Sequence, residues 1–183
     1  MQFVRNLVFP LVAPFAPALV FKKAKDDVSA MVGALLMGLI VVSLIRSVFF
    51  VPHEKSPDLS RIYDLVFFAL AFASRVFLSA GVLWLFLRFL LKKPTGLVLL
   101  LTQVALSFVP LSGIIATDTM YLSWSTLLLI ALPCELWHGA LIGLALRFRV
   151  GLSLKQAFAA AGLSLLLVLL MFDDVWGLTR LLP

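Results

Sequence analysis

Five long apolar runs constrain the fold of this chain more than any other feature of its sequence. Crossing about 30 Å of hydrocarbon takes about 20 residues of α-helix, and a helix is needed because lipid offers no partner to an open backbone group. Each run is long enough, so the sequence predicts an all-α integral membrane protein with five transmembrane helices. The predicted spans are residues 28–51, 63–91, 95–115, 121–146 and 154–172.

Composition and charge exclude most soluble classes. The chain has 183 residues, of which 63% are hydrophobic and 13% are charged, about half the charged share of a soluble domain. The net charge of +6 does not indicate nucleic-acid binding, because the basic residues stand at the ends of the apolar runs rather than in one patch. The lone cysteine, Cys134, cannot form an intramolecular disulfide.

A shorter apolar segment precedes the first span, and we expect residues 1–27 to form a unit separate from the transmembrane domain, residues 28–183. Its prolines break it too often for a spanning helix. The lysines that follow each add about 1 kcal/mol of attraction to anionic lipid. The pattern favours an interfacial segment that lies flat on the membrane and contacts lipid headgroups, with a cleaved signal peptide as the alternative. The prolines are Pro10, Pro14 and Pro17, and the lysines are Lys22, Lys23 and Lys25.

The distribution of Lys and Arg predicts the orientation. With a cytoplasmic N-terminus, ten of these residues lie at inner ends and four at outer ends, with Arg75 inside a span and left uncounted. Four aromatic residues fall at the predicted outer ends, where such rings favour the headgroup level. Five spans then place the C-terminus outside. The aromatic residues are Tyr63, Tyr121, Trp124 and Trp176.

Four polar residues deep inside the predicted spans are candidates for a site, because a charge there costs at least about 2.5 to 3.5 kcal/mol. Arg75 in the second span and Glu135 in the fourth lie at depths that differ by only about 3 Å. An ion pair between them relieves both desolvation penalties. His138 lies one turn further inward than Glu135, and Gln103 in the third span is placed to join the same intramembrane polar cluster.

Prolines interrupt two of the three predicted spans that carry this cluster. Pro110 in the third span and Pro133 in the fourth each remove a backbone donor and predict a helix kink. Transporters use interrupted helices near the midplane as binding sites. The cluster therefore has two interpretations, a structural one and a transport one in which Glu135 and His138 bind a proton or cation, and the structural one is favoured.

Metal, cofactor and catalytic sites are not expected. Glu135 and His138 form half of the Glu-x-x-His pattern of di-metal bundles, but no other predicted span contains a Glu or a His. A haem is disfavoured because His53, the other histidine, lies in an outer loop. Cys134 is the one candidate nucleophile, yet consecutive helix positions diverge by about 100°, so it does not share a face with Glu135.

Small residues predict close helix packing. Gly139 and Gly143 in the fourth span, and Ala157 and Ala161 in the fifth, are each four residues apart, as in small-xxx-small contacts. We favour contacts within the bundle over contacts between copies. Ser153, with Gln156 three residues later, has the spacing of a capping box for the fifth span.

Four stretches together suggest a family. They are a proline-containing opening at 10–15, Val109 and Pro110 in the third span, the connection 146–153 and the opening of the fifth span at 155–157. In this pattern and spacing the chain resembles the Yip1 domain family of five-span membrane proteins. The resemblance implies a cytoplasmic N-terminus and an outer or lumenal C-terminus, and its compact form is similar to prokaryotic members in a cytoplasmic membrane.

The resemblance implies binding of membrane proteins more than any chemistry. Eukaryotic members associate with small GTPases through a long N-terminal region, and because only 27 residues precede the first span here, we do not expect GTPase binding. The favoured function is a non-enzymatic membrane protein that binds other membrane proteins or itself, or shapes the bilayer. The alternatives are a small channel or transporter and an intramembrane enzyme.

Overall fold

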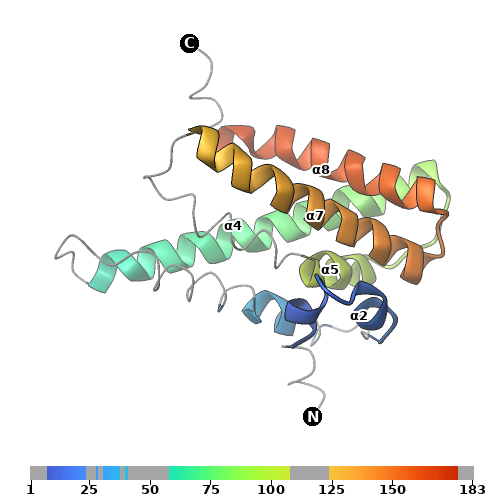
Figure 1. Cartoon of the computed structure of the whole chain (residues 1–183), viewed down its shortest axis with the longest axis horizontal. Coiled ribbons are helices and arrows are strands. Elements are labelled where there is room, and N and C mark those ends of the chain that lie inside the picture. The colour runs from blue at the N-terminus through green and yellow to red at the C-terminus, as the bar shows by residue number, and fades with distance from the viewer. Residues whose placement is uncertain are drawn as a thin grey trace.

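The computed structural model describes residues 8–23, 28, 31–37, 40, 58–107 and 124–176 (Figure 1). Over these residues the chain is all-α and contains no strand. The described part of the first predicted span, 28–51, is helical at 31–37. Lys25, Pro110 and the second half of the third predicted span lie outside the described residues.

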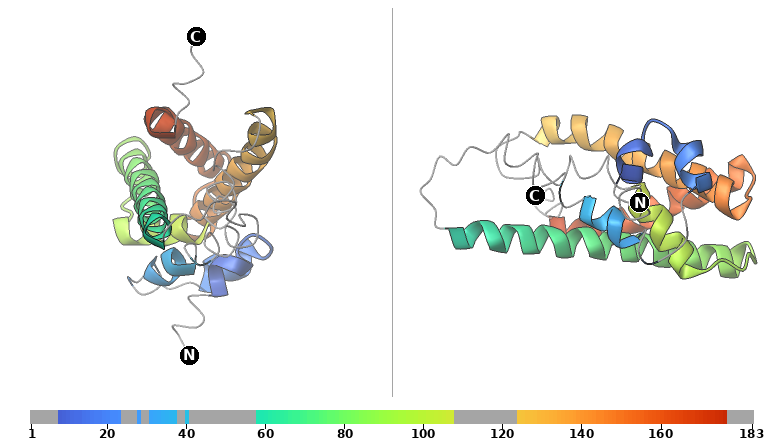
Figure 2. Two further views of the ribbon diagram at one scale, coloured as in Figure 1. Left: turned by 90° about the vertical axis from the view of Figure 1, so that its left-hand side faces the viewer. Right: turned by 90° about the horizontal axis from the view of Figure 1, so that it is seen from below.

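Three long helices form the body of the molecule. Helix α4 (Asp58–Leu85) continues directly into the π-helix η1 (Phe86–Leu90), and α7 (Trp124–Val150) and α8 (Leu154–Trp176) follow later in the chain. Helix α8 packs against both α7 and α4, and Figure 2 shows the three helices splayed around the shorter elements. The turns at 91–96 and 151–153 lie at one end of the molecule, which we call the basic end.

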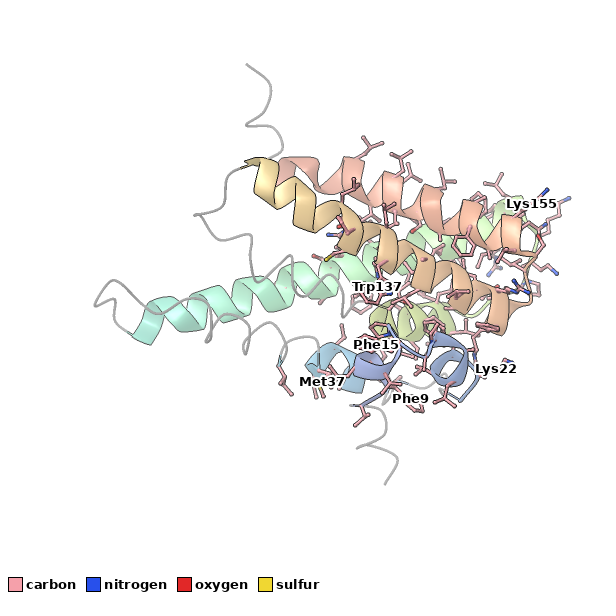
Figure 3. The ribbon with its side chains drawn as sticks, in the orientation of Figure 1. Phe9, Phe15, Lys22, Met37, Trp137 and Lys155 are labelled. Carbon is pink, nitrogen blue, oxygen red and sulfur yellow. The ribbon has the colours of Figure 1, made fainter. Side chains whose placement is uncertain are left out.

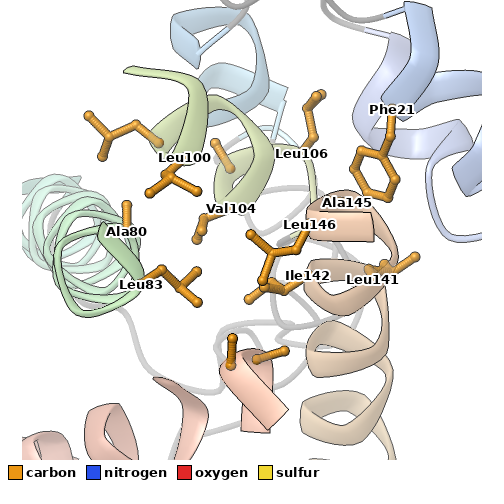
Figure 4. Close-up of a cluster of buried hydrophobic side chains, with 14 of the residues drawn as sticks. Phe21, Ala80, Leu83, Leu100, Val104, Leu106, Leu141, Ile142, Ala145 and Leu146 are labelled. Carbon is orange, nitrogen blue, oxygen red and sulfur yellow. The ribbon is translucent and has the colours of Figure 1, made fainter. Parts of the chain in front are cut away.

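Two short helices complete the described fold. Helix α5 (Leu97–Leu106) packs against α4 and touches α7, while α2 (Pro17–Lys23) packs against α7. Their apolar side chains meet those of the long helices in one core (Figure 4). The fully buried members with the largest side chains include Phe21 of α2, Leu83 of α4, Leu100 of α5, and Leu141, Ile142 and Leu146 of α7.

The boundary between α7 and α8 differs from the predicted connection 146–153. Helix α7 continues to Val150, so the connection shrinks to three residues. Gly151 ends the helix because its φ of +71° lies in the left-handed region, which glycine adopts without a steric penalty. The capping box forms as the spacing indicates: the Gln156 N–H donates to Ser153 Oγ, and the Ser153 N–H donates to Gln156 Oε1, both at 3.3 Å.

Glycines bring α7 and α8 into close contact. A Cβ at Gly143 would lie 3.2 Å from the ring of Phe158, and a Cβ at Gly139 would collide with Leu165, both residues of α8. Ala157 is fully buried, and Ala161 nearly so. The small residues therefore serve packing inside this chain.

The N-terminal segment runs along α7. Phe15 makes an edge-to-face contact with Trp137, with ring centroids 6.2 Å apart, and Lys22 Nζ lies 5.3 Å from the centroid of the Phe148 ring (Figure 3). Trp137 and Phe148 are separated by about 16 Å along α7. The segment therefore contacts α7 at two positions along its length, and its placement relative to a membrane stays a prediction.

One described segment, Ala73–Leu90, is both long and apolar enough to cross a membrane. The stretches Leu97–Leu106 and Leu154–Val168 are shorter apolar helices. The number of spans therefore stays a prediction, while the all-α architecture is observed.

Candidate functional site

The predicted ion pair is the centre of the candidate site. Arg75 on α4 donates from Nη2 to Oε1 of Glu135 on α7, across 60 residues of sequence. Their side chains are 9% and 13% exposed, so both charges are largely removed from the surroundings. A hydrogen-bonded ion pair is the form in which opposite charges are best tolerated there. The contact fixes the position of α4 relative to α7.

His138 links α7 to the end of α5. It is fully buried, and its Nδ1 lies 2.8 Å from the backbone carbonyl oxygen of Ser107. Because a carbonyl oxygen can only accept, Nδ1 carries the proton in this contact. Ser107 is the C-cap of α5, whose terminal carbonyls lack partners within the helix. The imidazole thus supplies a donor that this helix end requires.

Gln103 lies in the same buried region, one turn before the end of α5. It is 2% exposed, and its backbone carbonyl accepts a hydrogen bond of 2.7 Å from the Ser107 hydroxyl. The cluster therefore draws on three helices, with Arg75 from α4, Gln103 from α5, and Glu135 and His138 from α7. The sequence prediction did not include Ser107. Its position three residues before Pro110 is a signal for the end of a helix, where a backbone carbonyl needs a partner.

A second polar contact, not predicted from the sequence, joins α4 to α8. The buried hydroxyl of Ser164 donates to the backbone carbonyl of Ser79 at 3.3 Å. A serine in an apolar helix that finds a carbonyl on its neighbour gives no distinctive sequence pattern. Together with the Arg75–Glu135 ion pair, this hydrogen bond connects each of the long helices α4, α7 and α8 to another through polar groups.

Helix α7 continues through Pro133, next to the cluster. Cys134 is half-buried, and no disulfide involves it. Glu135 Oε2 is buried and accepts no hydrogen bond from the described residues. These residues give the site a kink-prone backbone and one carboxylate oxygen with remaining capacity.

The arrangement is suited to holding helices together. In the described part of the chain, no three His, Cys, Asp or Glu side chains are close enough to one another to bind a metal ion. Of the three lysines predicted to contact lipid headgroups, Lys22 is exposed over Phe148, while the side chain of Lys23 and all of Lys25 lie outside the described residues.

Comparison with protein-family models, with curated proteins and with solved structures finds no significant match to this chain.

Proposed function

We propose that this chain is a non-enzymatic, five-span membrane protein of Yip1-like type that organises its membrane, by binding other membrane proteins and by shaping the bilayer. The observation that carries the proposal is the Arg75–Glu135 ion pair. The two charges predicted to lie at membrane depth bind each other, and His138 binds a helix end. Groups committed in this way stabilise a scaffold and need no substrate to account for them.

The proposed topology has the basic end in the cytoplasm. Arg88, Lys92, Lys93 and Lys155 lie at this end among the described residues, as the excess of Lys and Arg on the cytoplasmic side requires. The apolar surface is consistent with lipid contact, since Phe77 and Phe89 are more than half exposed. In this orientation the N-terminal segment enters the cytoplasmic half of the membrane alongside α7.

That segment provides a physical means of shaping the bilayer. Three of its residues, Ala13, Val20 and Phe21, are fully buried, so it adds volume to the bundle on one half only (Figure 2). A membrane protein that is wider in one leaflet acts as a wedge. The exposed side chain of Phe15, which stands next to Trp137, is then an apolar group placed below the headgroups rather than in water.

The second candidate is a cation or proton pathway at the same cluster. It is favoured by one observation, the buried Glu135 Oε2 that accepts no hydrogen bond from the described residues. In this case the Glu135 carboxylate would bind the ion, and Arg75 would set the net charge of the site.

One experiment separates the two. The full chain, tagged at its C-terminus, is extracted from its native membrane into lipid nanodiscs, and the mass of the intact complex is measured. We expect a second membrane protein at fixed stoichiometry, retained in an Arg147→Gln control. A complex that contains this chain alone, together with cation flux in liposomes that is abolished by Glu135→Gln, would reject the organiser and establish the pathway.

A further inference from the structure

The basic end contains a cleft of about 660 Å³ where α4 turns towards α5. Three of its lining residues are cationic, one is a hydroxyl residue, and none is acidic. The lining residues are Arg88, Lys92, Lys93, Pro94, Thr95 and Gly96. A concave surface with three cations and no carboxylate attracts an anion and discriminates against cations.

The backbone and one side chain of this cleft are held in place. The Arg88 guanidinium lies over the ring of Trp84, 5.1 Å from its centroid, which fixes one of the donors. Lys92 has a φ of +51°, a left-handed conformation that reverses the chain directly after η1. The Lys93 N–H donates to the carbonyl of Leu87 at 2.9 Å and ties the turn to the helix end. The cations therefore sit on a defined turn.

Apolar side chains flank the cleft on both adjoining helices. Phe89 and Leu90 are about two-thirds exposed at the end of η1, and Leu97 and Val98 are both 42% exposed at the start of α5. A ligand with an anionic head and apolar chains would satisfy both kinds of surface. A guanidinium forms two parallel hydrogen bonds to a phosphate, and lysines add point charges.

From this arrangement we infer that the cleft between Arg88 and Gly96 is a binding site for a phosphate group, either the headgroup of an anionic phospholipid or free phosphate. Basic pockets on the cytoplasmic side of membrane helices bind such headgroups. The site is separate from the polar cluster, and a lipid headgroup as its ligand rests on the membrane location of the proposed function, whereas binding of free phosphate does not. It also differs from the predicted headgroup contacts of Lys22, Lys23 and Lys25, which are on the N-terminal segment.

The test measures lipid binding to the purified full chain by native mass spectrometry, with phosphatidylglycerol against phosphatidylcholine. The cleft variant is Lys92→Gln with Lys93→Gln. The matched control removes the same two charges from exposed positions at the same end, by Arg147→Gln with Lys155→Gln. We expect the cleft variant to bind phosphatidylglycerol about 30-fold more weakly, and the control to change the binding by less than about threefold.

A further variant and an added anion complete the design. Lys92→Arg with Lys93→Arg keeps the charge and should retain binding, which shows that loss in the neutral variant is not caused by misfolding. Inorganic phosphate that displaces the lipid at low millimolar concentration identifies free phosphate as the ligand, and lack of displacement identifies the lipid headgroup. Equal loss in the cleft variant and the matched control, or no loss in either, would overturn the proposal.

Discussion

Replacing Glu135 by glutamine should destabilise the protein more than replacing its partner Arg75 by glutamine. Each change leaves one largely buried group without its opposite charge, since the side chains of the pair are 9% and 13% exposed. The groups that remain respond differently. A guanidinium keeps its proton at every accessible pH, whereas a carboxyl group can take up a proton and become neutral.

The size of the effect follows from this asymmetry. Breaking a buried pair costs about 3 to 5 kcal/mol when a charge is left behind. We therefore expect Glu135→Gln to lower the free energy of unfolding by about 3 kcal/mol. In Arg75→Gln the neutral Glu135 lacks a hydrogen-bond partner rather than a counter-charge, which costs about 1 to 2 kcal/mol. The double variant should lose less than Glu135→Gln alone.

The assay is reversible unfolding of the purified protein in one detergent, followed by helical circular dichroism, with Arg147→Gln as the control. The reasoning would be refuted if Glu135→Gln unfolded at the same midpoint as the wild type. It would also be refuted if the double variant were no more stable than Glu135→Gln.

Two further predictions concern packing, and a third concerns topology. Gly143→Ala should cost about 1 to 3 kcal/mol by overpacking the α7 and α8 contact, while Gly162→Ala, whose Cβ meets nothing within 4 Å, should be neutral or stabilising in the same unfolding assay. In a Cys134→Ser background, a water-soluble maleimide should label Lys22→Cys and leave Phe15→Cys unlabelled in sealed inverted vesicles; equal labelling would place the segment on the surface. A reporter fused to the C-terminus should give a non-cytoplasmic signal, and a cytoplasmic signal would remove a span.

Much of the architecture could be predicted because long apolar helices obey strong local constraints. Apolar runs and caps predicted the second, fourth and fifth helices to within about five residues, and the Ser153 capping box forms as its spacing requires. The end of α7 was predicted too early because Arg147 and Arg149 were assigned to a connecting loop. They lie instead in the last turn of the helix, where basic side chains interact favourably with the helix dipole.

The site shows where a sequence stops being informative. Arg75 and Glu135 were paired by depth alone, because charge at that depth leaves few alternatives. The partner of His138, by contrast, is the backbone of Ser107, and a carbonyl at a helix end has no residue type that reveals it. Likewise, Lys22 indicated an affinity for the membrane, but the sequence did not show that the N-terminal segment contacts α7, since this depends on which rings Phe15 and Lys22 meet there.

Among the described residues, two features lie on the same half of the molecule. The N-terminal segment lies along the half of α7 that ends at Val150, and the basic cleft opens at the same end. The organiser that we propose needs this arrangement, because a segment that widens one leaflet and cations that hold anionic headgroups must act on the same leaflet.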